Sequence, residues 1–340
     1  MFSKLYDALK KILKDTYKEI IFVIIFTFIM FYPVPYYIVT GGGITDLNER
    51  FTIENSYKNS GSYNLSYVSQ TDGNVLTFLL SYVIPSWSKE KIEEYKASDN
   101  ETFIDIEKRD KLSLEVANEN ASFVAFTKAE RDFKINDVKL FIIYVDNEID
   151  SSEEIKIGDE IEKIDDIEVN SFEEFKNYIN GKNVNDYVTL RIKRDEKTKN
   201  IKVKIREKDE NKIVGLSFYK IYDYETNPKI TFNFKSGEQG SSAGFMTSLA
   251  IYDSLLEEDL TNGLKIAGTG TIDENGKVGE ISGVEEKIKG AESAKADIFF
   301  VPAENYPLAQ EIKKNKNYKI EIVKVTEFDD AVNYLRNRKK

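Results

Sequence analysis

Residues 230–256 read ITFNFKSGEQGSSAGFMTSLAIYDSLL, a strand pattern joined to a helix pattern by a glycine-rich turn. The first five residues favour a strand, because β-branched and aromatic side chains alternate with polar ones. From Ala243 onward, apolar residues recur at the spacing of one helix face: Phe245, Met246, Leu249, Ala250, Leu255 and Leu256. The turn itself, Gly240-Ser241-Ser242-Ala243-Gly244, satisfies G-x-S-x-G, a pattern that sets a nucleophilic serine between a strand and a helix.

The composition restricts how such a serine can react. The 340 residues contain no histidine and no cysteine, which excludes Ser-His-Asp and Cys-His catalysis, histidine-based zinc sites, thiolate clusters and disulfides. A lysine can serve as the base instead, provided that burial or neighbouring cations keep its amine neutral near pH 7. We expect no cofactor and no metal. An esterase-like hydrolase built on the serine turn alone stays open as an alternative.

Nucleic acid and ATP are not expected partners. The formal net charge is −11, whereas binding to a polyanion requires a basic face. Gly270 to Gly276, followed by Lys277, resembles a phosphate-binding loop. However, five residues separate the glycines instead of four, and Val278 stands where such a loop needs Ser or Thr.

The rest of the C-terminal part alternates between strands and helices, which predicts an α+β domain. We expect strands at 264–267, 277–281, 298–301 and 320–325, and helices at 284–294, 308–313 and 328–335. Asn275-Gly276 is typical of a hairpin turn, here between the strands at 264–267 and 277–281.

The N-terminal part predicts a membrane anchor. Residues 20–39 carry no charge, and about 20 apolar residues suffice to span a bilayer as a helix. Five lysines against three acidic residues precede this run, so the N-terminus is expected in the cytoplasm and the remainder outside. A cleaved signal peptide ending near Thr40-Gly41-Gly42-Gly43 is the alternative. A second apolar stretch, 75–84, is too short to span and predicts a buried helix or a membrane-docking face.

The middle of the chain divides into two regions. Residues 40–136 mix alternating segments (YNLSYVSQ, ASFVAFTKA) with a polar run, and predict a small membrane-proximal α+β region. From residue 137 the order is a strand at 138–145, the turn of IKIGDEIEKI, a helix at 172–179 and strands at 188–193 and 201–205. This order resembles a bacterial-type PDZ domain over 137–208, which implies a groove that holds peptides by strand addition. A β-rich spacer is the alternative.

The C-terminal motifs resemble the Lon-type serine–lysine protease domain, over about residues 225–337. Ser242-Ala243-Gly244 matches the nucleophile motif of that family, and the segment VGEISGVEEK (278–287) matches the one that ends in its catalytic lysine. The resemblance implies that Ser242 is the nucleophile and Lys287 the general base. It also implies that Thr269, in Thr269-Gly270, hydrogen-bonds the lysine amine, and that Gly240 and Ala243 support the loop. Two departures affect the loop: Ser241 replaces a proline, and Gln239 replaces an acidic residue.

The whole order resembles the membrane-bound PDZ–Lon proteases of Gram-positive bacteria, the SepM/YlbL type. We therefore expect an α+β multidomain chain with a cytoplasmic N-terminus (1–19), a transmembrane helix (20–39), the membrane-proximal region (40–136), the PDZ-like domain (137–208) and the proteolytic domain (209–340).

The function implied is that of a membrane-tethered, ATP-independent serine endopeptidase with a Ser-Lys dyad. Its substrates would be extracellular peptides or proteins, signalling peptides among them. Because Lon-type domains commonly form rings, the resemblance also allows a homo-oligomer. The alternative is an inert membrane-anchored PDZ scaffold that binds peptides without cleaving them.

Overall fold

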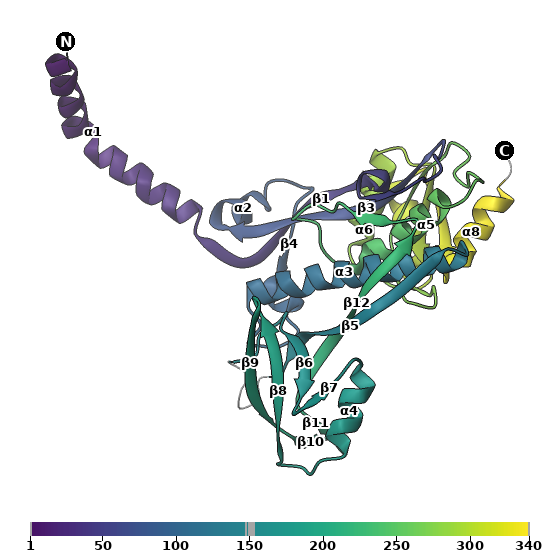
Figure 1. The fold of residues 1–340 in the computed structure, drawn as a ribbon. Helices are drawn as coiled ribbons and strands as arrows, with labels where there is room; N and C mark the ends of the chain where they lie inside the picture. The colour runs from purple at the N-terminus through teal and green to yellow at the C-terminus, as the bar shows by residue number, and fades with distance from the viewer. Residues whose placement is uncertain (1, 147, 149–153, 339–340) are drawn as a thin grey trace. The chain divides into compact units, whose positions relative to one another are not determined.

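The computed structural model describes residues 2–146, 148 and 154–338 (Figure 1). The chain forms two compact units, Met1–Gly41 with Ser69–Tyr95, and Gly42–Val68 with Lys96–Lys340. Strands β1 (Pro33–Asp46) and β3 (Ser62–Asn74) each run from one unit into the other. The stretch 40–136, expected as one membrane-proximal region, is therefore shared between the two units.

The first unit begins with α1 (Phe2–Met30), which is followed by strand β1. Pro33 and Pro35 disfavour continuation of the helix, and the residues after them, Tyr36 to Val39, are strand formers. These four residues pair antiparallel with β4 (Ser88–Lys91). The predicted transmembrane helix over 20–39 is therefore wrong, because its second half is a strand. Among the residues that the structure describes, no helix is both long and apolar enough to cross a membrane.

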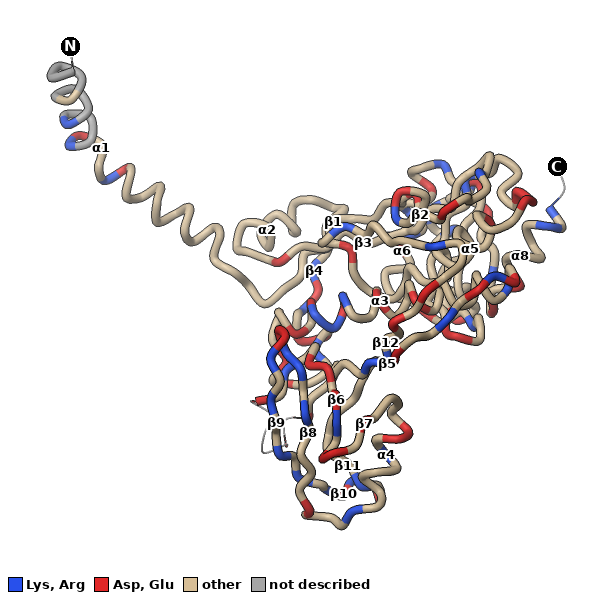
Figure 2. Tube along the Cα trace, viewed as in Figure 1, with Lys and Arg blue, Asp and Glu red and all other residues tan. Residues whose placement is uncertain are grey.

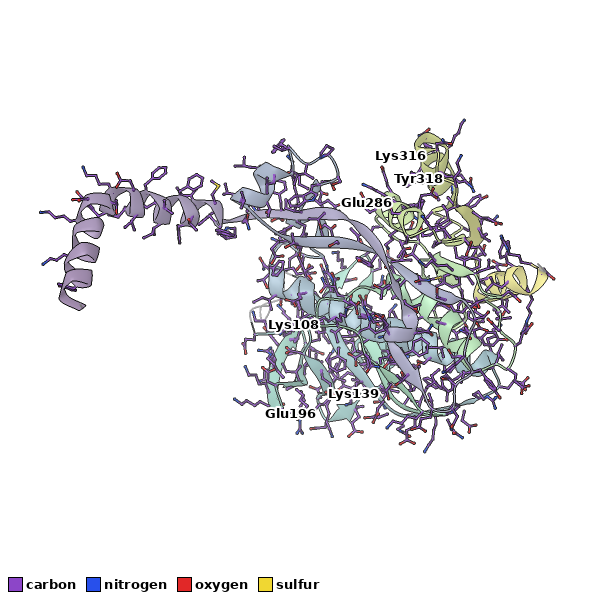
Figure 3. The ribbon with its side chains drawn as sticks, turned by 90° about the horizontal axis from the view of Figure 1, so that it is seen from above. Lys108, Lys139, Glu196, Glu286, Lys316 and Tyr318 are labelled. Carbon is purple, nitrogen blue, oxygen red and sulfur yellow. The ribbon has the colours of Figure 1, made fainter. Side chains whose placement is uncertain are left out.

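Two further features of the first unit concern apolar surface. Figure 2 shows α1 without charges over its second half, and Figure 3 shows side chains standing out from it; the large apolar ones from Ile20 to Ile29 are 39–73% exposed. Helix α2 (Val75–Leu80) begins at Asn74, which forms a capping box with Thr77, and it has no buried residue. The helix predicted over 75–84 thus forms over its first six residues, but the prediction that it is buried is wrong. A short 3₁₀ helix, Ile92–Tyr95, ends this unit.

Four parallel strands lie at the centre of the second unit, in the order β18 (Glu321–Val325), β17 (Ile298–Pro302), β14 (Lys265–Gly268) and β3. All five residues of β17 are buried, as expected where helices cover both faces of a parallel sheet. Phe300 belongs to a core with α5 (Gly244–Ser254) and α8 (Phe328–Asn337). Phe299 and Val301 belong to a second core with α6 (Val284–Ser293) and α7 (Tyr306–Lys316).

A long helix that the sequence analysis missed completes the first of these cores. α3 (Phe103–Lys128) begins at Thr102, whose side chain forms a capping box with Asp105. The segment ASFVAFTKA was described above only as alternating, and it lies at the C-terminal end of α3 and one residue beyond. Ala121, Val124 and Ala125 pack in the same core as Phe245 of α5, so tertiary packing decides the conformation of this segment. The core of the C-terminal part thus includes residues well before 209, where that domain was expected to begin.

The PDZ-like part is inserted between α3 and the strand that leads to Ser242. Its sheet has the order β12 (Leu216–Asn227), β5 (Asp132–Val145), β6 (Glu160–Ile164), β8 (Tyr187–Arg194) and β9 (Lys197–Lys204), with β7 (Ile167–Glu168) beside β6. Helix α4 (Phe172–Asn180) buries Phe175 and Ile179 against it. The chain enters through β5 and leaves through β12, and these strands pair antiparallel from Asp132↔Asn227 to Val145↔Leu216. β12 lies beyond the predicted boundary at 208, so the sheet depends on a strand that we had assigned to the next domain.

The remaining strands form two-stranded pairs. These are β10 (Arg206–Lys208) with β11 (Asn211–Ile213), β13 (Ile230–Phe232) with β2 (Phe51–Ile53), and β15 (Thr271–Ile272) with β16 (Val278–Gly279). The Asn275-Gly276 turn therefore joins β15 to β16. The predicted partner of the strand after this turn, 264–267, is wrong, since β14 pairs with β17 and β3 instead.

Candidate active site

Ser242 lies in a one-turn 3₁₀ helix, Ser241–Ala243, directly before α5. Gly240 precedes this turn with φ 91° and ψ 157°, a conformation that is accessible almost only to glycine. Its N–H donates to the carbonyl of Asp110 on α3 at 2.9 Å. Ala243 is buried, whereas Ser242 is partly exposed, so the serine hydroxyl is presented at the start of a buried helix.

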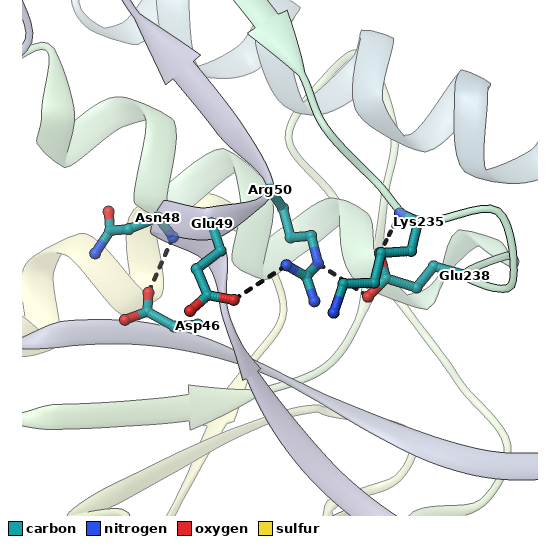
Figure 4. Close-up of polar contacts among 6 residues, drawn as sticks. All are labelled: Asp46, Asn48, Glu49, Arg50, Lys235 and Glu238. Carbon is teal, nitrogen blue, oxygen red and sulfur yellow. Dashed lines mark hydrogen bonds and ion pairs between the residues drawn. The ribbon is translucent and has the colours of Figure 1, made fainter.

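The loop before the serine is held from outside its own segment. Glu238 accepts the N–H of Lys235 at 2.8 Å and forms an ion pair with Arg50 at 2.9 Å (Figure 4). Arg50 follows a short 3₁₀ helix, Leu47–Glu49, and is 5% exposed. Sequence reasoning missed this support, because Arg50 and Glu238 are 188 residues apart.

Lys287 lies on α6 and points to Ser242. Its Nζ is 3.1 Å from the Oγ of Ser242 and 3.2 Å from the Oγ1 of Thr269. The lysine is 4% exposed, and burial lowers its pKa to about 8. The other lysines that compete for this role in the sequence, Lys277, Lys289 and Lys295, are exposed.

Close backbone packing places α6. A Cβ on Gly290 would lie 2.7 Å from the backbone N of Gly43, and one on Gly42 would lie 2.3 Å from the carbonyl O of Glu286. The glycines at 42 and 43, which the sequence analysis considered near a cleavage site, therefore allow β1 to pass against the helix that carries Lys287.

Thr269 connects the serine and the lysine. Its Oγ1 donates to the carbonyl O of Ser242 at 3.3 Å, and the N–H of Gly270 donates to the same oxygen at 3.0 Å. The N–H of Thr269 donates to Phe300 in β17 at 3.2 Å. The side chain is fully buried. The structure thus brings together Ser242, Lys287 and Thr269, with Ala243 and Gly240 on either side of the turn.

This arrangement has the parts needed for nucleophilic catalysis. A hydroxyl stands within hydrogen-bond distance of an amine whose charged form is disfavoured by burial. The start of α5 also adds the positive end of a helix dipole, which stabilises developing negative charge.

Substitution of Gly240 by alanine should clearly lower the rate of peptide cleavage and only slightly lower the thermal unfolding midpoint. No atom lies within 4 Å of a Cβ built there, so the cost is conformational, of order 1–3 kcal/mol, and we expect it to displace the serine turn. Peptide cleavage and the thermal unfolding midpoint of Gly240→Ala measure the two effects. Gly237→Ala, also without neighbours, is the matched control. Unchanged cleavage by Gly240→Ala would show that the turn tolerates the distortion.

Two family models match separate parts of the chain. Residues 118–205 match the PDZ domain family, and residues 234–337 match the Lon protease (S16) C-terminal proteolytic domain. No curated protein matches the chain.

Among solved structures, the PDZ domain of the SdrC-like protein from Listeria monocytogenes is 25% identical, with 23% of this chain and 85% of that chain covered and a TM-score of 0.22. The PDZ domain of the SdrC-like protein from Listeria innocua is 24% identical, with 24% and 93% covered and a TM-score of 0.23. The chain thus contains a stretch that matches the PDZ domain family and, after it, a stretch that matches the Lon protease C-terminal proteolytic domain, which supports a likeness to PDZ-containing, Lon-like serine peptidases.

Proposed function

We propose that the protein is an ATP-independent serine endopeptidase in which Ser242 is the nucleophile and Lys287 the general base. The observation that carries this proposal is the 3.1 Å distance between Lys287 Nζ and Ser242 Oγ at a buried amine. With a pKa of about 8, a useful fraction of the amine is neutral at pH 7–8.

In the proposed reaction, Lys287 takes the proton of Ser242 while the Oγ attacks the scissile carbonyl carbon. The resulting ammonium then donates that proton to the leaving amine as the C–N bond breaks. A water molecule, deprotonated by the again neutral lysine, attacks the acyl carbon of the acyl-enzyme. The ester C–Oγ bond then breaks, the lysine ammonium returns its proton to Ser242 Oγ, and the second product leaves with the new carboxyl group. Thr269 is the positioning residue, since it holds the lysine amine and the Ser242 carbonyl at once.

We propose that the PDZ part captures the substrate peptide between β12 and α4. β12 is the first strand in the order of its sheet, and an edge strand leaves one row of backbone groups open to strand addition. Phe218 of β12 stands 4.8 Å from Phe175 and 6.0 Å from Phe172 of α4, between ring centroids, and forms an apolar wall there. Gly215, directly before β12, has φ 70°, which permits the tight entry into the strand.

The cell-surface location, the membrane association and the homo-oligomer belong to the proposal as expectations. The exposed apolar side chains of α1 suit a lipid surface and support the membrane association.

The test compares Ser242→Ala with Ser241→Ala in the full chain, using a library of quenched fluorogenic peptides. We expect Ser242→Ala to lose cleavage and Ser241→Ala to retain it, because only the first hydroxyl contacts Lys287. Equal cleavage by Ser242→Ala and the unmodified chain would remove Ser242 from the reaction. If the unmodified chain and Ser242→Ala both bind peptides and neither cleaves them, the inert scaffold is favoured. If the unmodified chain hydrolyses only small esters, an esterase is favoured.

A further inference from the structure

A cavity of about 410 Å³ opens between α3, the second half of β12 and the segment that leads to Ser242. Its apolar wall is formed by five side chains: Leu114, Tyr222, Tyr224, Phe232 and Phe234. All of them belong to the second unit. The volume is ample for one large amino-acid side chain, and the mechanism proposed above does not use this cavity.

The cavity lies close to the reacting serine along the chain. Ser236 and Glu238 line it, and the four residues from Glu238 to Ser242 span at most about 14 Å when extended. On the other side, Lys111 lines the cavity, and the residue before it, Asp110, accepts the N–H of Gly240. A peptide with its scissile bond at Ser242 can therefore place a side chain here from within about four residues of that bond.

Two buried residues of α3 that carry oxygen acceptors, Asn118 and Glu119, line this cavity. Glu119 is 4% exposed, and its Oε1 accepts the N–H of Tyr222 at 2.6 Å. Asn118 is 9% exposed, and its Oδ1 has no hydrogen-bond partner in the structure. A buried acceptor without a donor costs about 1–3 kcal/mol, so the site favours a ligand that brings N–H groups.

The charged groups around Glu119 would favour the binding of an added cation there. Burial raises the pKa of Glu119 to about 8, with Glu115 and Glu274 raising it further, while the Tyr222 N–H and Lys220 lower it. The neighbouring cations already have partners: Lys220 pairs with Glu274 at 2.7 Å, Lys111 with Glu107 at 2.6 Å and Arg50 with Glu238. Lys235 lies at the exposed rim.

We propose that this cavity binds a lysine or arginine side chain of the substrate, within four residues of the scissile bond. Glu119 and Asn118 accept the N–H groups of the cationic end. The aromatic walls cover the aliphatic stem and attract the cation through their faces. An ammonium or guanidinium in the cavity favours the ionised form of Glu119. This inference rests on the proposed peptidase function, since it assigns a specificity pocket to that site.

The first experiment measures kcat/KM of the full chain on peptides that differ only by lysine or norleucine, with the variable residue placed in turn at each of the four positions on either side of the cleaved bond. We expect lysine to be favoured by about tenfold or more at one position, the range of a hydrogen bond to a charged group. Glu119→Gln should reduce that preference to below about threefold, because it slows cleavage of the lysine peptides more than cleavage of the norleucine peptides. Glu311→Gln, an exposed glutamate on α7, is the matched control.

A preference for apolar residues at every position, or a lysine preference that Glu119→Gln leaves intact, would overturn the pocket. Thermal unfolding shows whether Glu119→Gln is folded, and Asn118→Ala provides a second variant with the same expected direction. A binding measurement separates this outcome from failure of the proposed reaction. The same peptides, labelled with fluorescein, are titrated against Ser242→Ala with and without Glu119→Gln. Equal affinity for the lysine and norleucine peptides would contradict the proposed pocket, even if no peptide is cleaved.

Discussion

Replacement of Lys287 by arginine should lower kcat/KM for peptide cleavage by roughly 10²–10⁴, the usual contribution of a general base. A guanidinium cannot lose its proton in a protein, so it cannot take the proton of Ser242 even where it reaches the hydroxyl. The variant places a permanently charged and slightly longer side chain at the same position of α6. The expected loss therefore reports the proton transfer, and rates on one fluorogenic peptide measure it.

The control for this substitution is Lys289→Arg, on the same helix with an exposed side chain. We expect its rate to stay within about twofold of the unmodified chain, because exposed substitutions away from special features change little. A Lys287→Arg enzyme that keeps more than a tenth of its rate, while folded, would contradict the role of Lys287 as the base.

The elements that sequence reasoning placed well are those with strong local signals. The helices at 284–293, 306–316 and 328–337 and the buried strand at 298–302 lie within a few residues of the expected ranges. The three helices have apolar residues at helical spacing, and the strand is a short, continuously apolar run. Helix α8, for example, buries Phe328, Ala331, Val332 and Leu335 on one face.

The errors occur where distant partners decide the structure. The alternation in ASFVAFTKA has the period of a strand, yet the segment lies largely in α3, because its small and aromatic residues pack against α5. The charge-free run 20–39 has the composition of a spanning helix, but its last four residues pair with β4. β12 carries no signal of its membership in the PDZ sheet, since that depends on its pairing with β5, about 80 residues away.

The candidate site shows the same division. Motifs were sufficient to single out Ser242, Lys287 and Thr269, whose side chains the structure brings together. No sequence pattern predicts that Lys287 is buried. The burial accompanies the close approach of α6 to the glycines of β1. The acceptors Asn118 and Glu119 were missed because the polar residues of α3 have no motif and meet β12 only in the folded chain.

Substitution of Lys287 by methionine should stabilise the fold at pH 7 while it removes activity. A buried amine with a pKa of about 8, against 10.5 in the unfolded chain, disfavours folding below pH 8 by about 3 kcal/mol. Methionine has a similar length without the charge, so the variant avoids this cost. Urea unfolding followed by circular dichroism measures the difference in the free energy of unfolding between the two proteins.

The pH dependence of that difference has a definite sign. Between pH 8 and 10.5 the unfolded chain binds more protons at Lys287 than the folded chain does, so the unmodified protein gains stability as the pH rises through this range. The advantage of Lys287→Met should therefore be full below pH 8 and disappear near pH 10.5. Lys289→Met, at an exposed position of the same helix, should show neither effect. A constant advantage across this range would mean that better packing, and not the buried charge, stabilises the methionine variant, and the neutral amine that the proposed reaction needs would lose its support.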